Sequence, residues 1–234
     1  MGCPHYLAET AAEFRLEDGF DHPAAWMACH FSPYGIGLSN LPRKLPPDSL
    51  LMVDDITPIH GHDFDFIGEQ LKERVEALQC RGVVLDFQRP GYPECQALAG
   101  RLSKVLPCPV CLSSLYGKAF DGPVLLPPIP CSISPEAWLE DWKGRKIWLE
   151  TALDGERITL TEDGASLSPL PRFSPTEGGF AEDRLHCHYK ADTRDDKIIF
   201  TLWRTREDWE GLLEAAAALG VKLALGLYQE WKQY

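Results

Sequence analysis

The chain has 234 residues, of which 44% are hydrophobic, and its formal net charge at pH 7 is −12. This length suits one α/β domain with a large buried core. The negative charge argues against nucleic acid or an anionic membrane surface as a partner, because both require clustered Lys and Arg side chains. No apolar run reaches the length of about 18 residues that a membrane-spanning helix needs. We therefore expect a soluble protein with a neutral ligand.

The N-terminal residues 1–20 carry Glu9, Glu13, Glu17 and Asp18, where a secretory signal would need an uncharged apolar segment. We therefore expect a cytoplasmic protein whose eight cysteines are reduced thiols. The single Cys-x-x-Cys that starts at Cys108 opens a predicted strand rather than a helix, which favours a packing role over a zinc or redox site.

In the first half of the chain, apolar strands alternate with amphipathic helices. Asp63 is a suitable N-cap, because its carboxylate can accept hydrogen bonds from the first helical turn. The expected elements are a helix over Leu7–Leu16, strands over Ala24–Phe31 and Ser49–Asp55, a helix over Phe64–Gln79, a strand over Gly82–Phe87, a helix over Pro93–Val105, and strands over Val110–Ser114 and Val124–Pro127.

The second half of the chain adds a hairpin to this alternation. Ser134-Pro135 is typical of a helix start, and Gly220 is typical of a helix end. The expected elements are a helix from Pro135 to Trp142, a strand over Lys146–Ala152, a hairpin at Asp154-Gly155 leading into Arg157–Thr161, a long loop over Ser166–Asp183, paired strands over Leu185–Lys190 and Lys197–Trp203, a helix over Arg206–Leu219, and a last strand over Val221–Leu227.

Continuous apolar strands that alternate with helices are typical of a parallel sheet covered on both faces. The predicted strand centres number eight and are Trp26, Leu51, Val83, Val110, Val124, Ile147, Ile199 and Leu223. We therefore predict one domain over residues 1–234, an α/β fold of the slimmed-down (β/α)8 TIM-like barrel type with a β-hairpin insertion. An open doubly wound sheet is the alternative.

In such a barrel the functional residues lie at the carboxyl ends of the strands. The polar and aromatic residues expected there are His30, Tyr34, Asp54, Asp55, Asp86, Gln88, Ser113, Ser114, Glu150, Trp203 and the segment from Tyr228 to Trp231.

One of these strand ends, Arg81-Gly-Val-Val-Leu-Asp-Phe-Gln88, resembles a known motif. It is similar to the fourth-strand motif of the chitinase-type (family 18) glycoside hydrolases, Asp-Gly-x-Asp-x-Asp-Trp-Glu. Gly82 keeps the glycine and Asp86 keeps the last aspartate. The remaining motif positions are replaced, by Arg81, Val84, Phe87 and, at the catalytic glutamate, Gln88.

The resemblance implies hydrolase ancestry without the catalytic acid, because in that family the glutamate protonates the leaving oxygen and an amide cannot. It favours a pseudoenzyme that binds a carbohydrate, or a scaffold. The candidate ligand-binding residues are Asp86, Gln88, Tyr34, Glu150, Tyr228 and Trp231, the last two because family members commonly place a stacking tryptophan after the last strand. The structural alternative is that Asp86 and Gln88 only satisfy backbone groups.

A second hypothesis is a metal-dependent hydrolase that uses His60, His62 and the pair Asp54-Asp55, because both imidazoles of an extended His-x-His point the same way. His30 and a second His-x-His at His186 and His188 could add ligands. A third hypothesis is a non-catalytic interaction protein. The sequence has no nucleophile elbow, phosphate loop or dinucleotide fingerprint, so we expect no cofactor.

Overall fold

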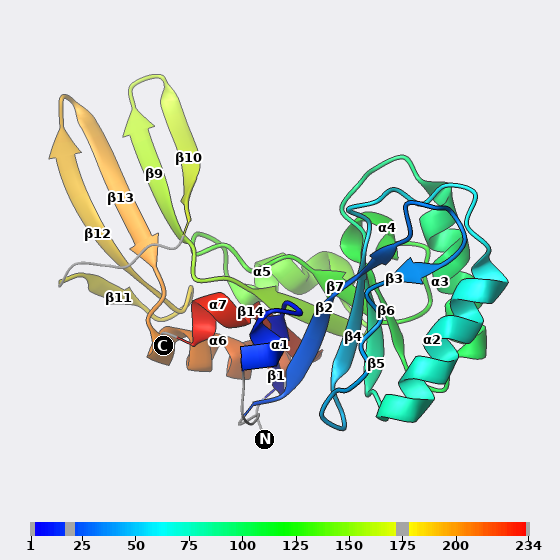
Figure 1. The fold of residues 1–234 in the computed structure, drawn as a ribbon. Helices are drawn as coiled ribbons and strands as arrows, with labels where there is room; N and C mark the ends of the chain where they lie inside the picture. The colour runs from blue at the N-terminus through cyan, green and yellow to red at the C-terminus, as the bar shows by residue number, and fades with distance from the viewer. Residues whose placement is uncertain (1–2, 17–21, 172–177, 233–234) are drawn as a thin grey trace.

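The computed structural model describes residues 3–16, 22–171 and 178–232, and these residues contain a closed eight-stranded parallel barrel (Figure 1). Its strands in chain order are β1 (His5–Glu9), β2 (Ala24–Phe31), β4 (Leu50–Asp54), β5 (Gly82–Asp86), β6 (Val110–Ser113), β7 (Val124–Leu126), β8 (Ile147–Thr151) and β14 (Val221–Leu227). The barrel closes because β1 pairs in parallel with both β14 and β2. The TIM-like barrel prediction is confirmed, and the open doubly wound sheet is excluded.

Long helices cover only part of the barrel. The long helices are α2 (Phe64–Leu78), α3 (Pro93–Val105) and α6 (Arg206–Ala218). The short elements are β3 (Leu38–Ser39), α1 (Glu13–Leu16), α4 (Ser114–Gly117), α5 (Pro135–Leu139), the 3-10 helix η1 (Glu140–Trp142) and α7 (Tyr228–Trp231). Asp63 caps α2 as predicted, because its carboxylate accepts from the backbone N–H groups of Asp65 and Phe66 at 2.9 and 3.1 Å. Among the described residues, none of the helices is both long enough and apolar enough to span a bilayer.

The insertion is larger than the predicted hairpin. Between β8 and α6 the described residues form a second, antiparallel sheet, which extends away from the barrel in Figure 1. Its strands in spatial order are β10 (Gly164–Leu170), β9 (Gly155–Thr161), β13 (Lys197–Trp203), β12 (Cys187–Arg194) and β11 (Phe180–Glu182).

Side chains of the barrel strands alternate between the lumen and the helices, because successive residues of a strand point to opposite faces. In β5, Val84 belongs to the lumen core, whereas Val83 and Leu85 pack with residues of α2 and α3. The same alternation turns Asp86 toward the lumen at the carboxyl end of the strand. All eight cysteines are free thiols, and Cys111 of the Cys-x-x-Cys lies buried in the lumen core, consistent with a packing role.

Two expectations about which segments form the barrel strands were wrong. The segment Leu7–Leu16 is not one helix, because His5–Glu9 is strand β1 and only Glu13–Leu16 is helical. Ile199 lies in β13 of the inserted sheet, so β1 replaces it as the eighth barrel strand. Residues 5–9 form a strand rather than a helix because the backbone groups of β1 make hydrogen bonds to two neighbouring strands. Local periodicity does not reveal this gain in free energy.

The inserted sheet corrects two further expectations. The hairpin turn lies between Thr161 and Gly164, and not at Asp154-Gly155, since β9 begins at Gly155. Much of the predicted loop over Ser166–Asp183 is strand, in β10 and β11, while residues 172–177 lie outside the described residues. The Ser and Pro residues of β10 are typical of a loop. However, β10 is an edge strand, and a proline is tolerated there because it need not donate a backbone hydrogen bond to a second neighbouring strand.

Candidate functional site at the carboxyl end of the barrel

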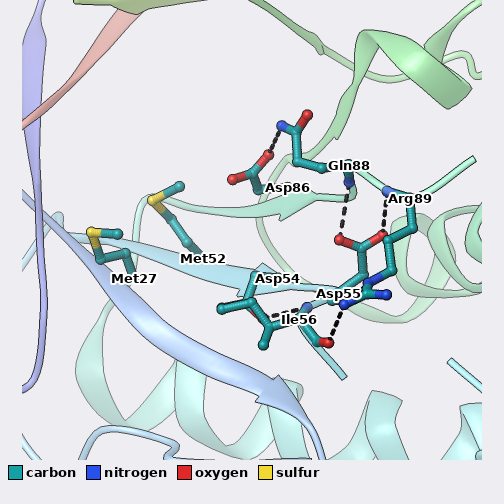
Figure 2. Close-up of a pocket in the computed structure, with 8 residues that line it drawn as sticks. All are labelled: Met27, Met52, Asp54, Asp55, Ile56, Asp86, Gln88 and Arg89. Carbon is teal, nitrogen blue, oxygen red and sulfur yellow. Dashed lines mark hydrogen bonds between the residues drawn. The ribbon is translucent and has the colours of Figure 1, made fainter. Parts of the chain in front are cut away.

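A pocket of about 390 Å³ opens at the carboxyl ends of β4 and β5, the end at which barrel proteins place their active sites (Figure 2). Its lining residues come from β2, β4, β5 and the segments that follow the last two strands. They are Met27, Met52, Asp54, Asp55, Ile56, Asp86, Gln88 and Arg89.

Asp86 and Gln88 are joined directly at this pocket. The side-chain nitrogen Nε2 of Gln88 donates to Oδ1 of Asp86 at 2.5 Å, and Figure 2 shows the amide oxygen of Gln88 pointing away from Asp86. Burial raises the pKa of Asp86, while the bond from Gln88 lowers it and the charges of Asp55 and Asp54 raise it further. The pair therefore presents a carboxylate beside an amide whose oxygen remains available to accept a hydrogen bond.

Asp55 holds the backbone that carries Gln88. Its two carboxylate oxygens accept from the N–H groups of Gln88 and Arg89 at 3.0 and 2.8 Å, and only 4% of its surface is exposed. Arg89 in turn donates from Nε to the carbonyl oxygen of Asp55 and from Nη2 to that of Ile56, both at 2.8 Å. Asp55 therefore positions the pocket rather than contributing a free carboxylate to it.

Glu150 of β8 faces the same lumen. Burial, together with the charge of Asp86, raises its pKa from 4.5 to about 7. The lumen residue Cys111 interacts with both carboxyls, and burial followed by the charges of Glu150 and Asp86 raises its pKa. Glu150 can therefore keep its proton to a higher pH than an ordinary glutamate and donate it to a hydroxyl group, while the oxygens of Asp86 can accept from one.

The other predicted ligand-binding residues lie elsewhere. Tyr34 is 89% exposed and does not line the pocket. Tyr228 stacks on His22 with ring centroids 5.4 Å apart, and Trp231 packs edge-on against His5 and Trp209 at 4.5 and 5.5 Å. Of the six predicted residues, Asp86 and Gln88 line the pocket, and the charge of Asp86 acts on Glu150. Tyr228 and Trp231 lie in α7, which packs against β1.

The predicted metal set is not assembled. Within the described part of the chain no three His, Cys, Asp or Glu side chains are grouped to hold a metal ion. Nδ1 of His62 accepts from the His60 N–H at 3.0 Å, and its Nε2 lies 3.1 Å from the carbonyl oxygen of Ser32. Asp54 accepts from the N–H of Ile56 at 3.0 Å, and Asp55 binds the backbone as described above. These side chains hold loops in place, so the structure does not support the metal-dependent hydrolase.

Sequence reasoning missed the apolar part of the pocket, which Met27 and Met52 form, and also missed Arg89. Met52 precedes Asp54 by two residues, so both side chains belong on one face of β4. This spacing could have identified Met52, whereas the position of Arg89 depends on contacts with Asp55 that are distant in sequence.

No family model matches the chain, and no curated protein matches it. Solved structures do share its fold. The spore cortex-lytic enzyme SleL of Bacillus cereus aligns with a TM-score of 0.55 and 11% identity over 98% of this chain and 73% of that one. SleL of Bacillus megaterium aligns with a TM-score of 0.52 and 10% identity over 97% and 70%. A chitinase from Chromobacterium violaceum aligns with a TM-score of 0.53 and 11% identity over 96% and 93%. At these identities the likeness shows a common barrel fold.

Proposed function

We propose that the protein binds a neutral glycan in the pocket at the carboxyl end of the barrel and lacks the acid catalysis of the family 18 hydrolases. The observation that carries this proposal is the hydrogen bond from Gln88 to Asp86 at the mouth of the pocket. An amide at this position can orient a carboxylate and accept from a hydroxyl, but it has no proton to give to a leaving group.

The position of the motif supports the proposal. In the described barrel β5 is the fourth strand, after β1, β2 and β4, which is the place of the resembling motif in the chitinase-type family. The resemblance matches Asp86 with the family's last aspartate and Gln88 with its glutamate. General acid catalysis contributes about 10²–10⁴-fold to such reactions, so its loss leaves binding as the principal role of the site.

The chemistry of the pocket also suits a sugar. Asp86 and Asp54 can accept from hydroxyl groups, and the amide of Gln88 adds an acceptor, while Met27 and Met52 provide an apolar wall for C–H faces. The size of the pocket lies in the range of small-ligand sites. Neighbours with the same fold are named as a chitinase and as spore cortex-lytic enzymes, which supports a polysaccharide-related ligand.

Isothermal titration calorimetry with short N-acetylglucosamine oligomers and a panel of other neutral glycans tests the proposal. We expect saturable binding that weakens about tenfold in Asp86→Asn, because a charge-assisted acceptor is lost. The exposed Asp121→Asn serves as the matched control and should bind as the wild type does. If the wild type binds no glycan of the panel, the proposal is wrong, and the scaffold hypothesis takes its place.

A further inference from the structure

The opposite, amino-terminal end of the barrel contains a second pocket, of about 380 Å³, with a cationic rim. Arg81 directly precedes β5, Lys146 directly precedes β8, and Lys222 is the second residue of β14. All three line this pocket, together with Ser103 of α3. Because parallel strands start at the same end of a barrel, their first residues gather there. A concentration of positive charge here contrasts with the net charge of −12 of the chain.

These cations have no carboxylate partner in the described part of the chain. The ion pairs found there involve other residues, and none includes Arg81, Lys146 or Lys222. Among the residues that the structure describes, no acidic side chain lines the pocket. Arg81 and Asp48 both act on the hydroxyl of Tyr6, whose pKa burial raises, so Asp48 lies in the neighbourhood without forming an ion pair with Arg81. The rim therefore carries three cationic groups outside any ion pair among the described residues, which favours an anion with more than one negative charge.

Trp148 of β8, which is 6% exposed, also lines this pocket. The ring extends from β8 across the lumen to β5, because a Cβ built on Gly82 would lie 2.8 Å from its Cη2 atom. Lys146 and Lys222 flank Trp148 on the paired strands β8 and β14, and Arg81 stands beside Gly82 at the far side of the ring. The three cationic residues thus line the same pocket as an apolar, largely buried indole.

We propose that this pocket binds a phosphorylated small molecule. Its phosphoryl oxygens bind Arg81, Lys146 and Lys222, and its uncharged part contacts the apolar lining formed by Pro109, Val110 and Trp148. Guanidinium and ammonium groups are the side chains that bind phosphate most strongly, and the volume exceeds what an inorganic phosphate ion needs. This site is separate from the glycan pocket, so neither proposal depends on the other.

Calorimetry with inorganic phosphate, pyrophosphate, glucose 6-phosphate and unphosphorylated glucose tests the site. We expect glucose 6-phosphate to bind more tightly than inorganic phosphate, and glucose not to bind here. Arg81→Gln and Lys222→Gln should each weaken glucose 6-phosphate binding about tenfold, because a charge-assisted contact is lost. Lys190→Gln removes an exposed lysine of the inserted sheet and is the matched control for net charge. Asp86→Asn alters the glycan pocket. Both variants should bind glucose 6-phosphate as the wild type does.

A second measurement locates the ligand. The indole N–H signal of Trp148 in a ¹H–¹⁵N spectrum, assigned from its loss in Trp148→Phe, should shift during titration with glucose 6-phosphate. Equal weakening by Lys190→Gln, an unmoved Trp148 signal, or the absence of saturable binding by every phosphate compound would overturn the proposal. Citrate binding as tight as that of glucose 6-phosphate would also contradict it, because the site would then select charge rather than phosphate.

Discussion

Asp55 and Arg89 bind each other in both directions: the Asp55 carboxylate accepts from the Arg89 backbone N–H at 2.8 Å, and the Arg89 side-chain Nε donates to the Asp55 carbonyl oxygen at 2.8 Å. The two residues lie at the ends of the neighbouring strands β4 and β5. This exchange fixes the segment that presents Gln88 to the pocket, so the geometry of the candidate site depends on a pair outside the resembling motif.

Replacement of Asp55 by alanine should therefore destabilise the protein. Two backbone N–H groups, those of Gln88 and Arg89, would lose their acceptor, and we expect a loss of about 2–4 kcal/mol in the free energy of unfolding. Urea denaturation followed by circular dichroism measures it. The exposed Asp121→Ala should change stability by less than about 0.5 kcal/mol. Equal losses of stability in the two variants would show that Asp55 does not hold the backbone of Gln88 and Arg89 in place.

Gln88→Glu should make glycan binding depend on pH. The introduced carboxylate would repel Asp86, so affinity should fall above neutral pH, where both groups are ionised. At lower pH a shared proton restores the donor, and affinity should recover. Calorimetry at pH 5 and pH 8 checks this, with the wild type as the reference. A pH-independent affinity in the variant would mean that the two side chains do not interact.

Glu150→Gln should stabilise the protein at alkaline pH. The folded-state pKa of Glu150 is raised from 4.5 to about 7, so the folded protein holds this proton more tightly than the unfolded chain. That contribution to stability is present below pH 4.5 and is lost as the pH rises through 7. The amide mimics the protonated acid, and the gain at pH 8 should be at most about 3 kcal/mol. Urea denaturation at pH 4 and pH 8 measures the difference, which should vanish at the lower pH.

Gly82→Ala and Gly100→Ala should have opposite effects. A Cβ on Gly82 would lie 2.8 Å from the Trp148 ring and 3.2 Å from the Pro109 carbonyl oxygen, so we expect a loss of about 1–3 kcal/mol. Gly100 lies within α3 with open space around its Cβ position, so alanine there should add up to about 1 kcal/mol. Thermal unfolding of both variants tests this. A harmless Gly82→Ala would show that the indole does not reach β5.

The thiols should react slowly in the native protein. Burial raises the pKa of Cys3 and of Cys108 to about 11, and that of Cys29, the more deeply buried thiol, rises further. Because the thiolate is the reactive form, an aromatic disulfide reagent at pH 8 should label the half-buried Cys3 and Cys108 first. All eight cysteines should react in denaturant. Rapid labelling of Cys111 without denaturant would contradict its burial in the lumen.

Much of the barrel and part of the site could be predicted from local pattern. The strands Ala24–Phe31 and Val221–Leu227 and the helix Pro93–Val105 have the predicted bounds. Asp86 and Gln88 were placed at a pocket because they end a continuous apolar strand. Tyr34, Tyr228 and Trp231 do not line this pocket, since the direction of a side chain beyond a strand end depends on neighbours from other segments, and their role in binding a ligand stays a prediction.

By itself, the amino-acid sequence determined the alternation of strands and helices, the cap at Asp63 and the carboxyl-end position of Asp86, because each depends on hydrogen bonds and side-chain periodicity within a few residues. Only the tertiary structure decided that β1 closes the barrel, that β13 leaves it for a second sheet, and that Arg81, Lys146 and Lys222 meet around Trp148. These outcomes depend on pairing between segments far apart in the chain, whose free energy no local pattern contains.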